Sequence, residues 1–266
     1  MPLQRLERYN TLERINTRFG RGSKEAEYLG LRAWNIARFE DDFMGDQMKY
    51  DATAPGTYQS TASGAAAATA AISTGVVNGA ALLDAGTDNA GRSDLSLGRH
   101  YRGDRKALYV ALLSINSITT RKFEVMFTDV LSGTDAGAVD TKATPTFNAT
   151  DCVGWVYDTA DDSRLTLVGN KNGTAATVVD VSTDIFTIAA NTYYYFGVQL
   201  DGDNAYGFIL DANGRKLTKD NDTVIIDAVS EDVLLTPWLF VQNRAANAGS
   251  MTVDWHMAQQ FRTPTV

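Results

Sequence analysis

The spacing of apolar residues along this chain has two different periodicities, and the change between them falls near residue 38. Before that point apolar residues recur every three or four positions, as one side of a helix requires. They are Leu3, Leu6, Tyr9, Leu12, Ile15 and Phe19. Gly20 and Gly22 favour a helix end, and Ser23 followed by acidic residues favours a second short helix. We therefore predict an N-terminal helical arm over residues 1–38.

From Phe39 onward the pattern indicates short strands separated by turns. The run 123–127 alternates as a half-buried strand does, and Asp201-Gly202-Asp203-Asn204 is a hairpin signal because Gly and Asn tolerate positive φ. A first strand ends at 41–45, and the others are expected at 95–97, 107–113, 123–127, 153–157, 165–168, 177–181, 193–200, 206–210, 234–242 and 251–259. Strands in this number, with no amphipathic helices between them, predict a mainly β body over residues 39–266. We favour an antiparallel β-sandwich over a barrel.

The Ala-rich stretch at residues 60–74 has helix propensity by composition alone. It carries no large apolar side chain that could dock a helix, and it lies between strand-like segments. We interpret it as an edge or surface strand with small side chains.

Charge divides the chain at the same place. Residues 1–38 hold eight basic and four acidic side chains, a net of +4, whereas the remaining 228 residues hold 16 basic and 28 acidic ones, a net of −12. An acidic body repels phosphate, which argues against a nucleic-acid partner. A basic arm on an acidic body is typical of a protein that docks on something larger.

Other features of the sequence limit the cellular setting. No apolar run approaches the ~20 residues that span a bilayer, and no secretory signal is visible, so we expect no membrane partner. The one cysteine, Cys152, excludes an intramolecular disulfide and a Cys-rich zinc site. These features fit folding in a reducing cytoplasm.

Candidate catalytic groups are few. The two histidines, His100 and His256, are interpreted as a surface residue and a structural residue of the last strand, and Cys152 as a buried small side chain. A glycosidase needs two carboxyl groups ~5–9.5 Å apart. Laminarinase-like sandwiches supply them from an E-x-D-x-x-E strand, but Glu124 is followed two positions later by Met126. We expect a protein that is not an enzyme.

Acidic turns leave structural calcium as an alternative to simple turn chemistry. The groups concerned are Asp201 with Asp203 and Asn204, Asp158 with Asp161 and Asp162, and Asp220 with Asp222. None matches a full EF-hand loop, and Asp and Asn are explained in hairpins by turn geometry. We therefore expect no metal site and no other cofactor.

The run Tyr193-Tyr194-Tyr195-Phe196 places Tyr193 and Tyr195 on one face of a strand and the other two rings on the opposite face. One face belongs to the core. The other either lies under a second layer or forms a platform for sugar stacking or subunit packing.

Several segments together resemble the concanavalin-like jelly-roll domains of tailed-bacteriophage virion proteins. They are RFEDDFMG at 38–45, the Ala-rich strand, NGAALLDAGTDNAGRSDLSLGR at 78–99, CVGWVYD at 152–158, TYYYFGVQLDGDNAYGFILDANGR at 192–215, and MTVDWHMAQQ at 251–260. The resemblance covers roughly residues 38–262 and includes no catalytic motif. It implies a jelly-roll fold and a role as a capsid decoration or fibre module or as part of a tail. Sandwiches of this shape also bind or cleave glycans, so fold alone does not decide function.

From these observations we expect a structural virion protein that is assembled in the host cytoplasm, most specifically a capsid decoration protein. Its partners would be the major capsid protein or another virion protein, and copies of itself as a homo-oligomer, with a trimer favoured over a dimer. The arm residues expected to bind are Leu3, Arg5, Leu6, Arg8, Leu12, Arg14, Ile15, Arg18 and Phe19. The apolar side of the arm would pack on its own body, on a neighbouring copy or on another protein. The alternative function is a glycan- or host-surface-binding module of a tail or fibre.

Overall fold

The structure, a computed structural model, describes residues 36–44, 58–64, 68–73, 79–131, 137–176, 178–181, 186–218 and 223–262. Of the helical arm expected at residues 1–38, only residues 36–38 are described. Its nine predicted binding residues all lie outside the described part of the chain. Residues 36–38 are not helical, because strand β1 (Ile36–Asp41) already begins at Ile36. The body therefore starts earlier than the change of pattern at residue 38 indicated.

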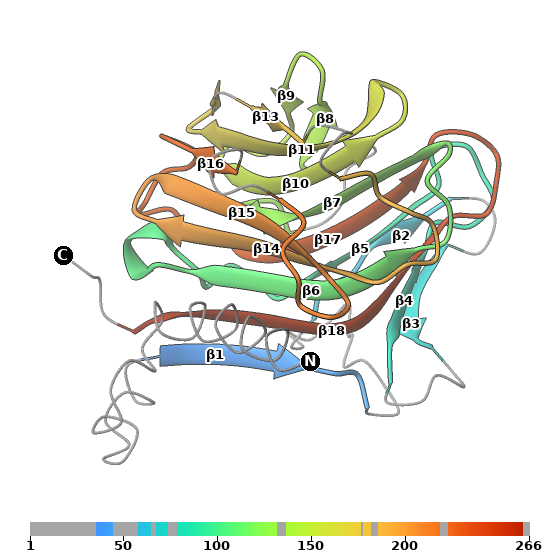
Figure 1. Cartoon of the computed structure of the whole chain (residues 1–266), viewed down its shortest axis with the longest axis horizontal. Coiled ribbons are helices and arrows are strands. Elements are labelled where there is room, and N and C mark those ends of the chain that lie inside the picture. The colour runs from blue at the N-terminus through green and yellow to red at the C-terminus, as the bar shows by residue number, and fades with distance from the viewer. Residues whose placement is uncertain are drawn as a thin grey trace, which may run out of the picture.

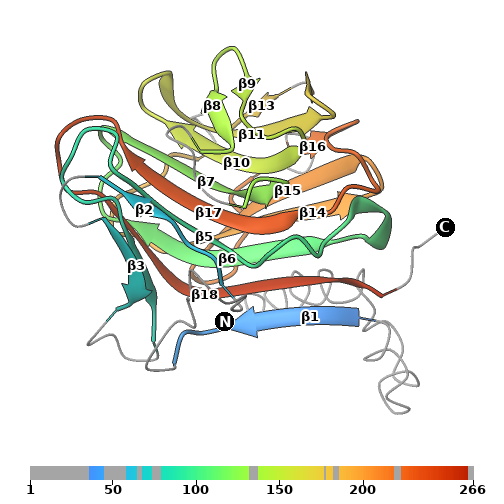
Figure 2. The ribbon, with the colours of Figure 1, turned by 180° about the vertical axis from the view of Figure 1, so that it is seen from behind.

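One of the two large sheets has β6 at its centre, and we call it the β6 sheet. Its strand order is β16-β15-β14-β6-β18-β4-β3, and β1 pairs with the second half of β18, giving eight antiparallel strands. Its other members are β3 (Thr69–Ile72), β4 (Ala81–Asp84), β6 (Leu108–Ile115), β14 (Tyr194–Asp201), β15 (Asn204–Asp211), β16 (Val224–Ile225) and β18 (Ser250–Phe261). Both views of the ribbon show β1 beside β18 at the margin of the sheet (Figures 1 and 2).

The second sheet has β7 at its centre, and we call it the β7 sheet. Its order is β12-β11-β10-β7-β17-β5-β2, with β13 also paired to β11. Its members are β2 (Ala62–Ser63), β5 (Arg92–Ser96), β7 (Arg121–Thr128), β10 (Cys152–Asp158), β11 (Asp162–Lys171), β12 (Thr174–Ala175), β13 (Val179–Asp180) and β17 (Thr236–Asn243). A separate hairpin of β8 (Val139–Thr141) and β9 (Thr146–Phe147) lies on the side of the molecule away from β1 (Figure 1). A short 3₁₀ helix, η2 (Gly103–Arg105), precedes β6.

The two sheets enclose the main core, which is built from the inward-facing residues of both. On β7, Phe123, Val125 and Phe127 are fully buried in this core, as their alternation predicts. Trp155 of β10 crosses the layer, because its indole N–H donates to the carbonyl oxygen of Gly197 on β14 at 3.0 Å. This bond joins the two sheets through their interior.

Most strands predicted from the sequence are confirmed, and so is the antiparallel sandwich. Residues 60–74 supply β2 and β3, which end the two sheets, so the edge-strand interpretation is right for the residues described. The short strands β4, β8, β9, β12 and β16 were not predicted. Among the described residues, no helix has the length and apolar character needed to cross a membrane.

The close approach of Trp155 to β15 generates a stability prediction. A Cβ built on Gly207 would lie 2.6 Å from the Trp155 ring and 2.8 Å from Leu167. Gly207→Ala should therefore lower the free energy of unfolding by about 1–3 kcal/mol, as overpacking does. Urea denaturation would measure it, and a variant as stable as the parent would mean that the ring does not rest on this glycine.

Candidate functional site

The outer face of the β7 sheet is closed by the β8–β9 hairpin. Ala138, Val139 and Phe147 of the hairpin region pack against outward-facing side chains of the sheet. Among these, Trp238 and Phe240 of β17 are fully buried, with their rings stacked at 6.2 Å between centroids. All residues of β7, β10 and β17 are buried, which means that both faces of the sheet centre are covered.

A buried ion pair lies beneath this hairpin. Lys122 and Glu124 project from the same face of β7, with the Lys122 Nζ 3.2 Å from Glu124 Oε1, and neither side chain is exposed. Glu124 also accepts hydrogen bonds from the backbone N–H groups of Ala138 at 2.9 Å and Val139 at 3.1 Å. The indole N–H of Trp238 donates to it at 3.0 Å. Both carboxylate oxygens are thus fully engaged, as a buried charge requires.

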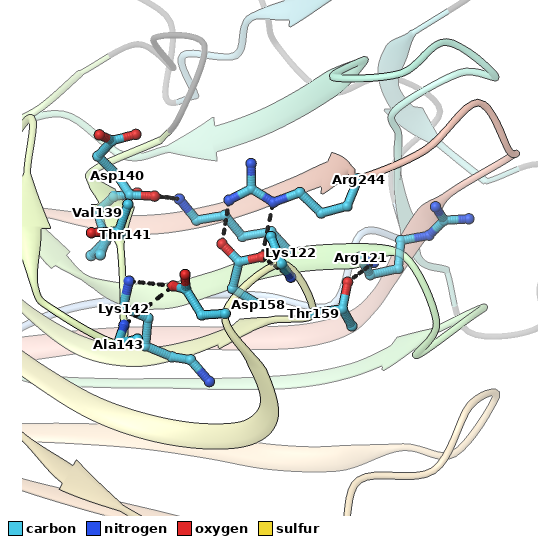
Figure 3. A network of polar contacts seen from close by, with 12 residues as sticks. Arg121, Lys122, Val139, Asp140, Thr141, Lys142, Ala143, Asp158, Thr159 and Arg244 are labelled. Atoms are coloured by element: carbon cyan, nitrogen blue, oxygen red, sulfur yellow. Dashed lines mark hydrogen bonds and ion pairs between the residues drawn. The ribbon is translucent and has the colours of Figure 1, made fainter.

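The same region contains a network of hydrogen bonds and ion pairs that holds the hairpin in place (Figure 3). Lys122 Nζ donates to the carbonyl oxygen of Val139. At the hairpin turn, the backbone N–H of Lys142 donates to Asp161 at 2.5 Å, and Lys142 Nζ pairs with Asp162. The pKa of Asp162 is lowered overall, because bonds from Lys142 and Arg164 outweigh the opposing effect of burial.

Other carboxylates of this sheet are also committed to the fold. Phe240 of β17 pairs with Glu124 of β7 on one side and with Asp94 of β5 on the other, so the two carboxylates share a face of the sheet. Asp94 is fully buried and accepts a hydrogen bond from the backbone N–H of Thr61 at 2.9 Å. At the strand ends, Asp129 accepts from the N–H of Thr150 at 3.1 Å. Burial raises the pKa of Asp129. None of these groups has the free, paired arrangement that glycoside hydrolysis needs.

The acidic turns bind the protein's own donors. Asp203 pairs with Lys171 and accepts the N–H of Glu231 at 2.8 Å. Asp158 holds Arg244 through both of its oxygens. Among the described residues, no group of three or more His, Cys, Asp or Glu side chains is placed to hold a metal ion. The third acidic pair, Asp220 and Asp222, lies outside them.

A second buried polar cluster fastens β1 to β18. The Tyr58 hydroxyl donates to Asp41 at 2.5 Å and lies 2.8 Å from His256 Nε2. Because its one proton goes to Asp41, the Tyr58 oxygen accepts from His256, which places the imidazole proton on Nε2. Nδ1 is buried without a partner. Phe43 stacks on the imidazole at 5.1 Å between ring centroids.

This cluster assigns His256 the structural role expected from the sequence. Burial lowers the pKa of His256 to about 4, although nearby Asp41 acts in the opposite direction. Burial, with a smaller effect from Asp41, raises the pKa of Tyr58. His100 is exposed and Cys152 is fully buried, as predicted.

The outer face of the β6 sheet differs from that of the β7 sheet. It carries an apolar cluster that we call the outer aromatic patch, which consists of Leu108, Val110, Tyr195, Phe208, Trp255, Met257 and Phe261. Tyr195 and Trp255 meet edge to face at 6.2 Å between centroids, and the Trp255 indole N–H donates to Glu40 at 3.0 Å. Every strand described belongs to one of the two sheets or to the β8–β9 hairpin, so none of the described strands lies over this patch.

Sequence reasoning found one member of the patch and missed the rest. Tyr195 was correctly separated from the core rings Tyr194 and Phe196. The overlooked signal is apolar residues at every second position on the second face of a strand, such as Leu108 with Val110. The Tyr58–Asp41–His256 cluster gave no local signal, because Tyr58 and His256 are 198 residues apart.

No protein-family model matches the sequence, and no curated protein matches it. Several solved structures share the fold. The β-glucanase of Bacillus licheniformis is 10% identical with a TM-score of 0.53, and the match covers 84% of this chain and 97% of that one. Peanut lectin is 12% identical with a TM-score of 0.54, covering 86% and 99%. The CBM2 module of the evolved Dit of Lactobacillus casei BL23 phage J-1 is 9% identical with a TM-score of 0.52, covering 87% and 99%.

These similarities establish the architecture as a concanavalin-like jelly roll. The expected fold is therefore right for the body. Because the set includes a lectin, a glucanase and a phage module, the fold is compatible with more than one activity.

The Glu124 cluster leads to a mutational prediction. Glu124→Ala should lower the free energy of unfolding by about 3–5 kcal/mol, because the buried charge of Lys122 would lose its carboxylate counterion. Glu231→Ala, on an exposed residue, should change it by less than about 0.5 kcal/mol. Guanidinium denaturation would give both values. Equal stability of the two variants would show that the hairpin does not rest on this carboxylate.

The His256 cluster predicts a pH dependence. A histidine whose folded pKa is depressed contributes stability above its unfolded pKa of ~6.5, and that stability is lost as the pH falls toward the folded value. With a folded pKa of about 4, the loss between pH 6.5 and 4 should approach roughly 3 kcal/mol. His256→Gln, which keeps an N–H donor, should remove this component, whereas His100→Gln should retain it. Identical pH profiles for the two variants would contradict the assignment.

Proposed function

We propose that this chain is a non-enzymatic structural protein of a tailed-phage particle, most specifically a capsid decoration protein. The observation that carries the proposal is the closed outer face of the β7 sheet, where Glu124 is bonded on both oxygens under the hairpin. Because the hairpin region covers the outer face of the β7 sheet, a partner must bind elsewhere on the body. The commitment of Glu124 to the hairpin supports a binding role over chemistry on a substrate.

The virion setting rests on separate support. The segments from residue 38 to 262 resemble phage virion jelly rolls, and a phage Dit module shares the fold. On a lattice, many weak contacts act together because neighbouring copies raise the effective concentration. The basic N-terminal residues supply a means of attachment, since Arg pairs bidentately with carboxylates. Self-association, with a trimer ahead of a dimer, belongs to the same proposal.

A second candidate function is glycan or host-surface binding as part of a tail or fibre. The outer aromatic patch favours it, because half-buried rings such as Tyr195 and Trp255 are suited to stacking on sugars. A glycan array discriminates between the two candidates. Saturable binding that Trp255→Ala abolishes would replace the capsid proposal with this one.

The location can be tested on particles. Tailed-phage particles from cells that carry the gene should contain the protein at a fixed ratio to the major capsid protein, measured by quantitative mass spectrometry after gradient purification. Immunogold labelling should decorate heads rather than tails. Absence from purified particles would refute the virion role. Label confined to tail tips would support the tail or fibre module in place of the capsid decoration protein.

The basic arm leads to a binding prediction. The double substitution Arg14→Glu with Arg18→Glu, which reverses two charges, should weaken binding to particles that lack the protein by about ten-fold, on the order of 1.4 kcal/mol. The binding of the parent should also fall with added salt, as screening requires. The matched control is Arg164→Glu with Arg215→Glu, the same charge change on exposed residues of the body. Co-sedimentation gives the affinities, and an equal loss in both variants would show that only net charge matters.

A further inference from the structure

We infer that the outer aromatic patch is the docking surface for the chain's own N-terminal segment, residues 1–35. The patch is apolar across the neighbouring strands β15, β14, β6 and β18. Leu108, Val110 and Met257 are buried, whereas Tyr195, Phe208, Trp255 and Phe261 are only partly buried. A group of partly open apolar side chains on an outer sheet face is a candidate interaction site. This docking takes place within the free chain in solution.

The place where the segment enters the body supports this occupant. Strand β1 is paired with β18 so that Ile36 lies opposite Phe261, which is a member of the patch. Residue 35 therefore joins the body at the border of the patch. Glu40 of β1 extends that border, because its carboxylate accepts the Trp255 indole N–H.

The N-terminal segment is long enough to reach every part of the outer aromatic patch. The residues between Phe19 and Ile36 can span up to ~50 Å when extended. Four adjacent strands of a sheet measure only ~14 Å between the outer two. Residues 6–19 can therefore reach any part of the patch without displacing β1.

The composition of the segment matches the patch. At 100° per residue, Tyr9, Leu12, Ile15 and Phe19 fall on one side of a helix, and Arg14 and Arg18 fall on the other. The apolar side needs a cover as much as the patch does. The net charge of +4 over residues 1–38 is opposite in sign to that of the rest of the chain, which attracts the segment to the body.

This arrangement has a consequence for recognition. With the apolar side of the segment against the β6 sheet, its basic side faces outward and forms a surface for an acidic partner. The patch itself is then covered, so a sugar would have to displace the segment before it could stack on Trp255. The two binding modes become mutually exclusive.

Tryptophan quenching in the full-length chain tests the inference without particles or glycans, so its failure would leave the virion proposal standing. The four tryptophans are Trp34, Trp155, Trp238 and Trp255. In a Trp34→Phe background, Trp155 and Trp238 are fully buried, so iodide quenching reports on the half-buried Trp255. Leu12→Ser with Ile15→Ser should raise the quenching constant roughly two-fold, because water then reaches the uncovered indole. Thr11→Ser with Thr17→Ser, on the polar side, should leave it unchanged.

Two further measurements make the result decisive. Trypsin should cut at Arg14 and Arg18 faster in the Leu12/Ile15 variant than in the control, whether or not the indole signal is large. Quenching of the parent should also stay constant on dilution into the nanomolar range. Equal quenching and equal cleavage in both variants would overturn the inference, and quenching that rises on dilution would reassign the patch to a segment from a second copy.

Discussion

The buried pair of Lys122 and Glu124 is the constraint on which the rest of this molecule depends. A carboxylate and an ammonium group in the interior of a protein are tolerated only when both are paired and hydrogen-bonded. Here the donors come from the hairpin region, through the N–H groups of Ala138 and Val139. The hairpin is therefore required by the charge beneath it, and the outer face of the β7 sheet is closed as a consequence.

Closing that face determines where the protein can interact. Trp238 and Phe240, which would be suited to stacking on a ligand if they were exposed, are instead part of a second core. Within the described part of the chain, the outer face of the β6 sheet carries a further apolar cluster, the outer aromatic patch, of which four members are only partly buried. Strand β1 lies at its border, fastened by Asp41, Tyr58 and His256. Strand β1, which follows the basic N-terminal residues in the sequence, therefore begins beside a sheet face over which none of the described strands lies.

The sequence predicted the sandwich because its strands obey local rules. The alternation at 123–127 and the turn at 201–204 are readable within a few residues, and both are confirmed. Strand β4 was missed because four residues, Ala81–Asp84, carry too weak a pattern. The role of Glu124 could not be predicted either, since its partners on the hairpin and on β17 are distant in the chain. The burial of Glu124 follows from the packing of the hairpin region on the outer face of β7, which no local sequence pattern indicates.

Shared architecture with a lectin, a glucanase and a phage module explains why the fold does not decide the function. The feature of this chain on which its architecture depends is the closed outer face of the β7 sheet. Hydrogen–deuterium exchange of the full-length chain tests it most directly. The amides of Ala138 and Val139 should exchange as slowly as those of β7 and β10, because both donate to a buried carboxylate. Exchange of these two amides within seconds, as in an exposed loop, would show that the hairpin stands open and would contradict the account.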